Sequence, residues 1–524
     1  MTITRYAPNG VVAAANHLAA TAGLHMLRQG GNAADAAVAA AAAMAVTGSH
    51  MCGLGGDVFA VVAGGGQQAP AALNASGRAG SGADPGRLAA AGAQAMPFRH
   101  DIRSVTVPGC VDGLVALHER FGTLPLPDLL APARRLAEDG FPVSPTLAAA
   151  SVELAPAERE AAFGSASPLA EGRRLTLPGH ARALAAVAAD GRAGFYLGPA
   201  GEDLLTVGGG EFTEDDLRSS QADWVTPLRL AAFGRDLWTI PPNSQGYLAL
   251  SGAWIAERVG LPTAADTELW AFLLVEAARQ AAYDRPRVLH EHADGTALLA
   301  ESRLAPRAAA VTERAARGLA DVYGDGGTTY LCAVDSQRMG VSLIMSNASD
   351  FGSQLMLPRH GIFLHNRGTG FSPRPGDPAG YGPGRRPPHT LSPLAATRPG
   401  GELDAVLGTM GGDAQPQVLL QLLVRMLALG QEPGLAVSAP RWILSREPTN
   451  AFDTWLGDDP PLVRVEHGAP KTWVPGLRAR GYQVIESPPG DQTFGHAQAI
   501  RVTPDGLLAG AADPRSGDGA VAGR

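Results

Sequence analysis

Cysteine is scarce in this 524-residue chain: only Cys52, Cys110 and Cys332 occur, far apart and without a CxxC pair. This argues against a disulfide scaffold and against a cysteine-based zinc site. Long apolar runs are also missing. The longest, 33–46, is mostly alanine and contains Asp35, whereas a bilayer span takes about 20 apolar residues. The N-terminus has no charged segment followed by an apolar one, so no signal peptide is expected.

Positive charge is not in excess either. The 42 lysines and arginines are outnumbered by 50 aspartates and glutamates, which leaves a formal net charge of −8. Such a chain lacks the basic surface of a nucleic-acid-binding protein and the basic clusters that attract lipid headgroups. We therefore expect a cytoplasmic protein with neither a nucleic-acid nor a membrane partner.

Glycine and proline are abundant, with 66 and 41 residues. Together they form about a fifth of the sequence, which is below the share that suggests low-complexity disorder. The glycines have no period of three, so a collagen-like structure is excluded. The length corresponds to roughly three to four domain-sized units or to one large fold, and it suffices for a sizeable core.

The first part of the chain predicts two helices, a turn and a strand. Apolar spacing favours a helix over 19–27 that ends at a Gly-Gly pair, and Asn32 stands where an N-cap belongs, ahead of an alanine-rich helix over 33–46. The glycine cluster 53–56 precedes a strand-like run over 58–63. It lacks the Lys-Ser/Thr of a phosphate-binding loop and does not lie between a strand and a helix, so it predicts a tight turn.

Helices are expected to dominate the first two-thirds of the sequence, and strands the last third. The segment 371–388 is rich in proline and glycine and is predicted to be a loop, and the end of the chain, 516–524, is expected to be mobile. No internal repeat of fixed period is found. The further helices are expected at 126–139, 181–190, 268–283 and 303–320, and the further strands at 329–334, 341–345, 405–407, 498–502 and 507–508.

The junction 325–330, Asp-Gly-Gly-Thr-Thr-Tyr, is the most informative place in the chain. A threonine hydroxyl is a weak nucleophile unless a base stands beside it. An N-terminal threonine carries that base itself, because its α-amino group titrates at about 7.7–8.0. Thr328 becomes N-terminal only if the bond after Gly327 is cleaved. From these residues alone, a strand that starts after a turn is the simpler interpretation.

The order of motifs resembles that of the γ-glutamyltransferase family of N-terminal nucleophile hydrolases over nearly the whole chain. One such motif is a weak signal, but this many in the same order identify the chain as a member. The match at 328–335 falls where the family has its processing site and its nucleophile. The other matches lie at 19–39, 51–56, 105–113, 241–246, 346–353, 366–368, 386–390 and 410–413.

The resemblance implies an α+β fold, a four-layer αββα sandwich formed by two intertwined subunits of one precursor. Thr328 would attack the carbonyl of Gly327 and free its own amine. Residues 1–327 would become a helix-rich large subunit, and residues 328–524 a strand-rich small subunit. The resemblance implies no metal and no organic cofactor. Its protein partners would be the two subunits of the same precursor, with a dimer of these heterodimers left open.

The resemblance also assigns site residues. Thr328 Oγ would attack a small-molecule amide while its amino group shuttles the proton. Ser346 matches a family threonine whose hydroxyl holds the nucleophile. Gly411 and Gly412 match the glycines whose N–H groups form the oxyanion hole, and losing one such donor typically costs about 3 kcal/mol. Arg78 matches the arginine that holds the substrate carboxylate, a group that a guanidinium binds through two parallel hydrogen bonds.

Several positions depart from the family pattern. Gly370 replaces an aspartate that pairs with the substrate α-ammonium, and Ala348 replaces an asparagine. The carboxylate clamp is therefore kept and the ammonium clamp largely lost. An unpaired buried ammonium is costly, so a free α-amino acid is not expected as the substrate. The other substrate-binding candidates are Asn347, which could replace the missing asparagine, Arg367, which stands for a glutamine, and His389 and Thr390, which stand for paired serines.

We therefore expect a self-processing threonine amidohydrolase or acyltransferase that cleaves an amide of a small carboxylate-bearing acyl group, γ-glutamyl or similar. The runs 241–246 and 409–417 look closest to a branch that includes oxamate amidohydrolase, and glutaryl-cephalosporin acylases are also relatives. An oxamate amidohydrolase or glutaryl-type acylase without γ-glutamyl activity is thus one alternative. An unprocessed ligand-binding pseudo-enzyme is the alternative from another class. His290 and His292 show no third ligand, so a solvated loop is favoured over a metal site.

Overall fold

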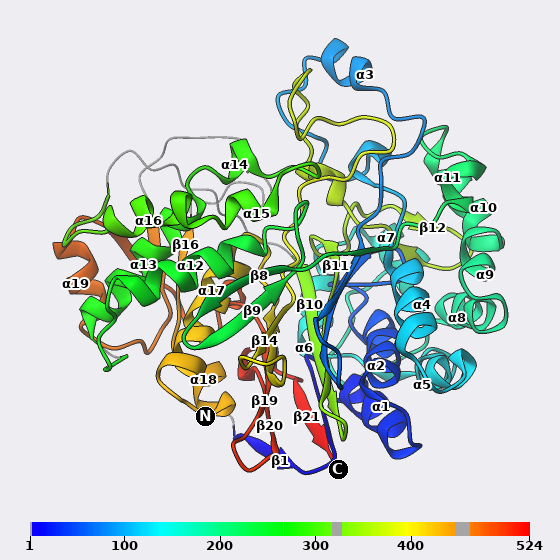
Figure 1. The fold of residues 1–524 in the computed structure, drawn as a ribbon. Coiled ribbons are helices and arrows are strands. Elements are labelled where there is room, and N and C mark those ends of the chain that lie inside the picture. The colour runs from blue at the N-terminus through cyan, green and yellow to red at the C-terminus, as the bar shows by residue number, and fades with distance from the viewer. Residues whose placement is uncertain (1–2, 266, 317–326, 446–461) are drawn as a thin grey trace.

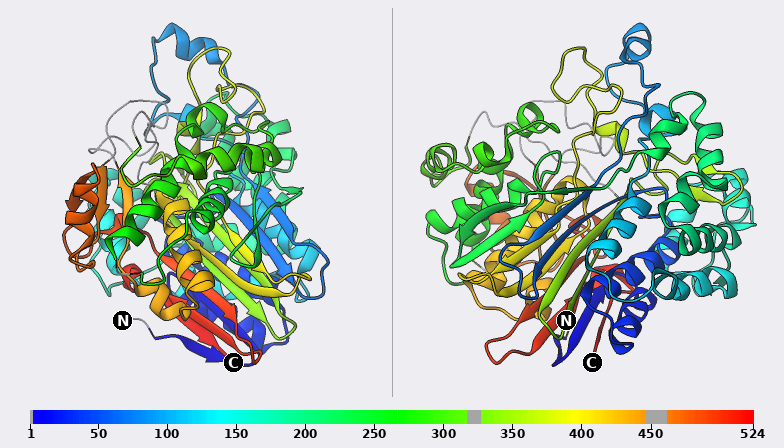
Figure 2. Two further views of the ribbon diagram at one scale, coloured as in Figure 1. Left: turned by 60° about the vertical axis from the view of Figure 1, so that its left-hand side comes forward. Right: turned by 45° about the vertical axis from the view of Figure 1, so that its right-hand side comes forward.

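Two seven-stranded sheets lie face to face between two layers of helices (Figures 1 and 2). The computed structural model describes residues 3–265, 267–316, 327–445 and 462–524. From edge to edge, the first sheet contains β21 (Ala520–Gly523), β2 (Gly10–Ala14), β10 (Gly327–Asp335), β11 (Met339–Ala348), β3 (Asp57–Gly64), β4 (Ala71–Ala75) and β7 (Asp223–Val225). The second sheet contains β1 (Arg5–Ala7), β20 (Leu508–Ala512), β19 (Ala497–Val502), β15 (Leu403–Thr409), β14 (Leu394–Thr397), β9 (Arg235–Thr239) and β8 (Leu228–Ala232).

Both faces of the first sheet are buried, and single strands supply side chains to both. In β10, Leu331 and Ala333 pack against the helices, whereas Tyr330, Cys332 and Val334 pack between the two sheets. Successive side chains of a strand point to opposite faces, so a strand that is covered on both faces needs apolar residues at every position. A third apolar cluster joins the second sheet to its own helices. The four-layer αββα architecture expected from the sequence is thereby confirmed.

The helix layer over the first sheet is built around α2 (Ala33–Thr47), in which every residue is buried. Asn32 caps this helix, as predicted. Its side chain accepts from Ala34 N and Asp35 N, and Asp35 accepts from the Asn32 N–H in return. The same layer contains α1 (His17–Arg28), α4 (Cys110–Phe121), α5 (Leu126–Asp139), α6 (Pro145–Ser151), α8 (Pro178–Asp190), α9 (Arg192–Tyr196) and α10 (Pro199–Gly208).

The helix layer over the second sheet is built around α13 (Glu268–Ala282). Thr267 caps its N-terminus by accepting from Trp270 N, and the Trp270 ring stacks on that of Trp473 from α19 (Trp473–Ala479). Long-range contacts of this kind tie the last third of the chain to the middle third. The layer also contains α12 (Tyr247–Arg258), α15 (Gly295–Leu298), α16 (Glu301–Ala309), α17 (Gln415–Leu423) and α18 (Pro433–Ser438).

Strands from distant parts of the chain alternate in the first sheet. β10 lies between β2 and β11 and is antiparallel to both, so Leu331 pairs with Ala14 on one side and with Leu343 on the other. Segments on either side of the Gly327–Thr328 bond thus contribute strands to the same sheet. This interleaving is what two intertwined subunits require, although the division at that bond stays a prediction.

Two expectations about local structure are wrong. The end of the chain, which was expected to be mobile, pairs with the first sheet. Ala520–Gly523 forms the edge strand β21 beside β2, and Arg524 N donates to Gly10 O. The helix expected over 303–320 is α16, which ends at Ala309. Beyond it, Ala315 N donates to Arg480 O instead of to a helical partner. Both outcomes depend on contacts with distant residues, and residues 317–320 lie outside the described ranges.

The other helices and strands expected from the sequence are confirmed to within a few residues, and 371–388 is a loop apart from one isolated bridge. The mostly helical middle of the chain also contains three unexpected strands, β7 to β9. No helix in the described ranges is both long and apolar enough to cross a membrane. The remaining regular elements are α3 (Pro85–Ala90), α7 (Pro156–Phe163), α11 (Glu214–Arg218), α14 (Arg285–Val288), β5 (Phe141–Pro142), β6 (Arg174–Leu175), β12 (Met356–Leu357), β13 (Ile362–Phe363), β16 (Trp442–Ser445), β17 (Leu462–Val465) and β18 (Gln483–Glu486).

Candidate active site

Several strand ends meet at one edge of the stacked sheets. β10 and β3 begin there and β11 ends there, with Ser346 paired in register with Asp57. In the second sheet, β9 and β15 end and β14 begins at the loops that face this edge. Hydrogen bonds between these loops hold them together, since Gln245 Nε2 donates to Thr390 O at 3.0 Å and to Gly412 O at 3.1 Å. The candidate residues therefore come from four or more segments that only the fold unites.

Thr328 stands at an irregularity in the pairing of β10 with β11. The register shifts between Gly327 and Thr329, and such a bulge re-aims the side chain that it carries. Thr328 is fully buried, and its Oγ1 lies 3.0 Å from Ser346 Oγ. The peptide bond predicted to be cleaved thus lies where the strand ladder is interrupted.

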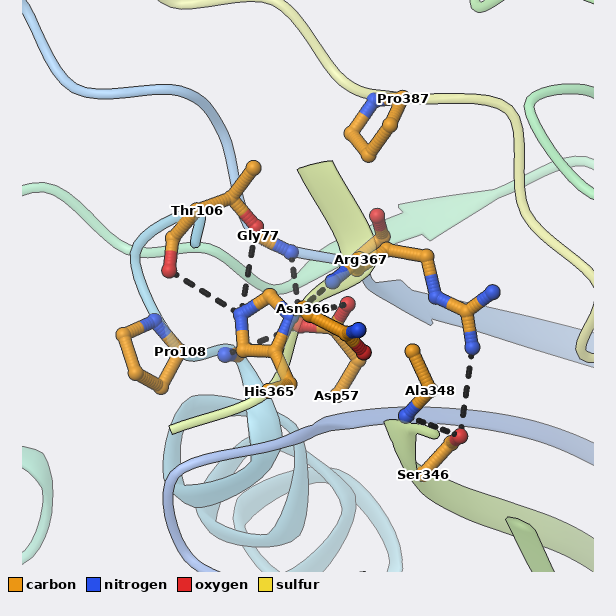
Figure 3. Close-up of polar contacts among 12 residues, drawn as sticks. Asp57, Gly77, Thr106, Pro108, Ser346, Ala348, His365, Asn366, Arg367 and Pro387 are labelled. Atoms are coloured by element: carbon orange, nitrogen blue, oxygen red, sulfur yellow. Dashed lines mark hydrogen bonds and ion pairs between the residues drawn. The ribbon is translucent and has the colours of Figure 1, made fainter. Parts of the chain in front are cut away.

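Ser346 Oγ accepts two hydrogen bonds besides its contact with Thr328. The N–H of Ala348 donates at 2.8 Å and Nη2 of Arg367 at 3.2 Å (Figure 3). A hydroxyl oxygen offers two acceptor sites and one proton. In the contact between Ser346 Oγ and Thr328 Oγ1, either hydroxyl can donate. A proton donated to Thr328 Oγ1 stabilises negative charge on that oxygen, as activation of a nucleophile requires.

Arg367 joins Ser346 to the loop before β14. It begins the short helix η2 (Arg367–Gly370), is 1% exposed, and donates from Nη1 to Thr390 Oγ1 at 3.1 Å. Burial lowers the pKa of its guanidinium to about 10, so the group is a cation at neutral pH. A positive charge therefore lies next to the hydroxyl pair.

Asp57 supplies a buried negative charge nearby. Its carboxylate accepts from Gly77 N at 3.0 Å and from His389 Nε2 at 3.1 Å. His389 Nδ1 accepts a backbone N–H, which assigns the ring proton to Nε2, and burial together with Arg367 lowers the pKa of His389 to about 3. Burial alone would raise the pKa of Asp57, but nearby His365 and the bonds from His389 and Gly77 outweigh it and hold that pKa below its usual range. His389 is thus a neutral donor to an ionised carboxylate.

His365 lies beside Asp57 and accepts a hydrogen bond from the backbone of Arg367. The Arg367 N–H donates to His365 Nδ1 at 3.0 Å, which assigns the ring proton to Nε2, and Nε2 donates to Thr106 O at 3.0 Å (Figure 3). The same Nδ1 lies 4.0 Å from Asp57 Oδ2. Burial lowers the pKa of His365, which keeps the ring neutral. The ring fixes the backbone from which the Arg367 side chain extends.

The peptide groups at Gly411 and Gly412 have fixed directions. Both residues have positive φ, +125° and +52°, a region that favours glycine. Gly411 O accepts from Ala414 N at 2.9 Å, and Met410 O accepts from Thr409 Oγ1 at 2.7 Å. The C=O and N–H of a trans peptide point in opposite directions, so these bonds also orient the N–H groups of both glycines. Two oriented N–H groups suit an oxyanion hole, and this role stays a prediction.

Arg78 forms an ion pair with Asp223. Its Nη2 donates to Asp223 Oδ2 at 2.6 Å, and Arg386 Nη1 donates to the same oxygen at 2.8 Å. Asp223 lies in β7, on the far side of β4 from β10, and β3 and β11 lie in between. The Arg78 side chain is also 31% exposed. The Arg78 guanidinium is therefore paired with Asp223, while the N–H of the preceding Gly77 donates to Asp57.

Asn347 and Gly370 are two positions at or next to which the sequence departs from the family pattern, and the structure shows what surrounds each of them. Asn347 follows Ser346 on β11, so its side chain is on the opposite face, where Nδ2 donates to Ser49 O at 3.1 Å. Gly370 packs against the loop before β14, and a Cβ built on it would lie 2.6 Å from Pro388 O. No side chain fits at position 370 unless that loop moves. The structure thus brings together Thr328, Ser346, Arg367, Thr390 and, through Asp57, His389. The Asn347 side chain lies on the other face of β11, and the role of Arg78 in substrate binding stays a prediction.

Reasoning from the sequence missed Asp57, His365 and Gln245. Asp57 did carry a signal, because an aspartate at the start of a buried strand must find partners. Gln245 lies in the matched run 241–246, but its partners Thr390 and Gly412 lie more than 100 residues away in the sequence, as does Thr106, the partner of His365 Nε2. In the described residues, no three His, Cys, Asp or Glu side chains are grouped as a metal site.

The chain is similar to known proteins over nearly its whole length. The family model described as Gamma-glutamyltranspeptidase matches residues 19–523. The oxamate amidohydrolase proenzyme of Klebsiella pneumoniae is 36% identical, and the glutathione hydrolase-like YwrD proenzyme of Bacillus subtilis is 33% identical, each over 98% of both chains. Among solved structures, the cephalosporin acylase from Bacillus halodurans is similar with a TM-score of 0.89 and 31% identity, over 100% of this chain and 97% of the other.

Proposed function

The chain belongs to the gamma-glutamyltranspeptidase family, a family of enzymes, and we propose that it is a self-processing threonine amidohydrolase. Its substrate is an amide of a small acyl group that carries a carboxylate and no α-ammonium. The observation that carries the proposal is the buried contact between Thr328 Oγ1 and Ser346 Oγ, which lies at the interrupted start of β10. The word proenzyme in the names of both relatives also supports self-processing.

The first reaction is cleavage of the chain itself. Thr328 Oγ attacks the carbonyl carbon of Gly327, and the acyl group moves from the Thr328 nitrogen to its oxygen as the C–N bond breaks. The nitrogen takes up the hydroxyl proton and becomes an amine. Water then hydrolyses the ester, which leaves a carboxylate on Gly327 and a free α-amino group on Thr328. That amine is the base that an unmodified threonine lacks.

The second reaction is cleavage of the substrate. The Thr328 amine accepts the hydroxyl proton while Oγ attacks the amide carbon, and the N–H groups of Gly411 and Gly412 stabilise the oxyanion. The proton passes to the leaving nitrogen, and an acyl ester on Thr328 remains. Water adds to that ester by the same route and releases the acid. Ser346 contributes a hydrogen bond to Oγ throughout, since its own oxygen is held by Arg367 and Ala348 N.

The charges near Thr328 support the choice of substrate. Arg367 provides a buried cation beside the nucleophile, and the Pro388 backbone occupies the space into which an aspartate at position 370 would extend. An anionic group is thus favoured next to the nucleophile, whereas an α-ammonium has no counterpart for the family aspartate. The relatives named oxamate amidohydrolase and cephalosporin acylase are consistent with such a substrate.

Self-cleavage is tested by intact mass under denaturing conditions, with the Thr328→Ala variant as the matched control. We expect two fragments from the natural protein, divided between residues 327 and 328, and one 53.8 kDa chain from the variant. The two fragments should co-elute in a native size-exclusion run, because β10 of the small fragment is paired with β2 of the large fragment. The chain contains one lysine, Lys471. Amine labelling should therefore mark one site more in the natural protein than in the variant, and this site is the Thr328 amine.

A single uncleaved species from both proteins would overturn self-processing and favour the ligand-binding alternative. Substrate choice is tested separately by steady-state rates with oxamate, glutaryl-p-nitroanilide and γ-glutamyl-p-nitroanilide. We expect turnover of at least one of the first two and little of the third. Efficient γ-glutamyl turnover would show that the site accepts an α-ammonium after all.

A further inference from the structure

Gln245 joins two loops of the candidate site through a single side-chain group. It lies between β9 and α12, is fully buried, and donates from Nε2 to Thr390 O at 3.0 Å and to Gly412 O at 3.1 Å. Because both partners are carbonyl oxygens, they assign the amide nitrogen to this end of the side chain. One NH2 group therefore holds the two carbonyl oxygens no more than about 6 Å apart.

The glycine turn, residues 409–414, contains three successive carbonyl groups that each have a partner. Met410 O and Gly411 O accept from donors inside the turn, whereas Gly412 O accepts from Gln245. A peptide group is planar and rotates as one unit, so fixing its oxygen also fixes its N–H. Among these three contacts, that of Gln245 comes from the part of the chain before residue 328. Gln245 thus fixes the peptide that follows Gly412 from outside the turn.

Thr390, the other partner of Gln245, belongs to the hydrogen bonds that surround the proposed nucleophile. Its Oγ1 accepts from Arg367 Nη1 at 3.1 Å. Arg367 also donates to Ser346 Oγ, which lies 3.0 Å from Thr328 Oγ1. Gln245 therefore connects the residues around the nucleophile to the glycine turn. The reaction depends on the separation of these two parts, and an error of about 1 Å in such a separation can cost about 100-fold in rate.

The glycine turn has a second contact of the same origin. Arg285 Nη2 donates to Asp413 Oδ1 at 2.6 Å, and both side chains are almost fully buried. Asp413 directly follows Gly412, and Arg285, like Gln245, precedes the predicted cleavage site. If the chain is cleaved there, one fragment holds a turn of the other. The contacts of Gln245 and Arg285 therefore join the two fragments at the candidate site itself.

We propose that Gln245 is a positioning residue for the reaction: it holds the glycine turn at a fixed distance from the Thr390 loop, so that the N–H groups of the turn face the carbonyl that Thr328 attacks. This inference rests on the proposed function and adds a residue to its machinery. Gln245 lies in segment 1–327, whereas the turn and the nucleophile lie in segment 328–524. The oxyanion hole of the cleaved enzyme therefore depends on both fragments.

The first test measures kcat and KM separately, with the amide that the natural protein hydrolyses fastest. Gln245→Met removes both hydrogen bonds and nearly keeps the side-chain volume. We expect kcat to fall by about 10- to 100-fold and KM to change by less than about threefold, because a misplaced oxyanion hole weakens binding of the transition state and not of the substrate. A loss confined to KM would overturn the proposal.

Gln245→Glu is the milder variant and serves if the methionine variant does not fold. Burial favours the protonated form of the new carboxyl group, and that form can donate to one of the two carbonyls. Its kcat should therefore lie between those of the natural protein and Gln245→Met. A glutamate variant with the kcat of the natural protein would show that the double hydrogen bond is not needed.

Gln421→Met is the matched control. Gln421 is also buried, and its Nε2 also donates to two backbone carbonyls, Gln417 O at 3.1 Å and Trp442 O at 2.9 Å. It lies in the last part of α17, away from the glycine turn. We expect a similar decrease in Tm from both methionine variants, but a decrease in kcat from Gln245→Met only. An equal loss of kcat in both would mean general destabilisation and would overturn the positioning role.

Hydrogen–deuterium exchange separates this inference from the function on which it rests. The amides of 409–414 should exchange at least about tenfold faster in Gln245→Met than in the natural protein, and at the natural rate in Gln421→Met. Unchanged exchange in Gln245→Met would overturn the inference. If the enzyme hydrolyses amides but Gln245→Met keeps the natural kcat, the proposed function holds and the positioning role is wrong. If the protein hydrolyses no amide, the proposed function fails, and exchange still decides whether Gln245 holds the turn.

Discussion

At the scale of single residues, the candidate site is a short series of hydrogen bonds that links Arg367 to Thr328 through Ser346. Arg367 and the Ala348 N–H both donate to Ser346 Oγ, which lies 3.0 Å from Thr328 Oγ1. A hydroxyl at position 346 is therefore held within hydrogen-bond distance of the proposed nucleophile, and a threonine could provide it equally well.

Replacing Ser346 tests this contact. Ser346→Ala removes the hydroxyl beside Thr328 Oγ1, and if that hydroxyl donates to the charge that develops during the reaction, we expect kcat to fall by about 100-fold, the typical effect of losing one such donor. Self-cleavage, which uses the same oxygen, should slow in parallel and can be followed by mass spectrometry over time. Ser346→Thr keeps the hydroxyl and should retain activity. An alanine variant with the natural rates of both reactions would show that the contact is structural only.

At the scale of elements, β10 is held in place from every side. In the first sheet it pairs with β2 and β11, and across the gap the Tyr330 ring occupies the space above Gly408 of β15, where a Cβ would lie 2.1 Å from the ring. Tyr330 Oη lies 2.9 Å from Ser342 Oγ, which accepts from Leu394 N of β14. The strand that carries Thr328 is therefore anchored in both sheets.

The C-terminal strand completes the same sheet and can be removed. Deleting residues 520–524 takes away β21 and exposes the backbone of β2, whose Val11 to Ala14 pair with it. At roughly 1 kcal/mol for each backbone hydrogen bond lost, we expect a destabilisation of about 2–4 kcal/mol, seen as a lower Tm. Exposed strand edges also promote aggregation, which light scattering would detect. An unchanged Tm would mean that β21 contributes nothing to the sheet in solution.

At the scale of the whole molecule, the four layers bury several histidines in their neutral form. Burial lowers the pKa of His50 and of His389 to about 3, and that of His180 and of His496 to about 4. Their pKa when exposed is about 6.5, so between pH 6.5 and 4 the unfolded chain binds protons that the folded chain does not. Stability must then fall as the pH falls.

The size of this effect follows from the number of groups. Four histidines lower stability on acidification, and Asp350 opposes them, because burial raises its pKa to about 7 and the folded chain takes up its proton first. Near pH 5 the net difference is about three protons, equivalent to a slope of about 4 kcal/mol per pH unit. We expect Tm to decrease steadily from pH 7 to pH 4.5 in scanning fluorimetry. A Tm that is constant or rises on acidification would show that these rings are hydrated in the folded state.

The sequence alone determined the features that depend on neighbouring residues or on motif order. The Asn32 cap, the alanine-rich helix after it and the strands around Thr328 were predictable because caps and apolar periods act over a few residues. The family and its four-layer fold followed from motifs spread along the chain. The same motifs identified Thr328, Ser346 and the paired glycines as candidate site residues, and the catalytic roles of these residues are still predictions.

The tertiary structure alone decided which of these residues touch. That Arg367 reaches Ser346 and Thr390, that Asp57 gathers Gly77 and His389, and that Arg78 turns toward β7 depends on contacts between segments 20 to more than 300 residues apart. The same holds for the last strand, which pairs with residues more than 500 positions earlier. Local patterns cannot encode such pairings, because they arise when separate strands and loops are packed into one core and their polar groups must find partners there.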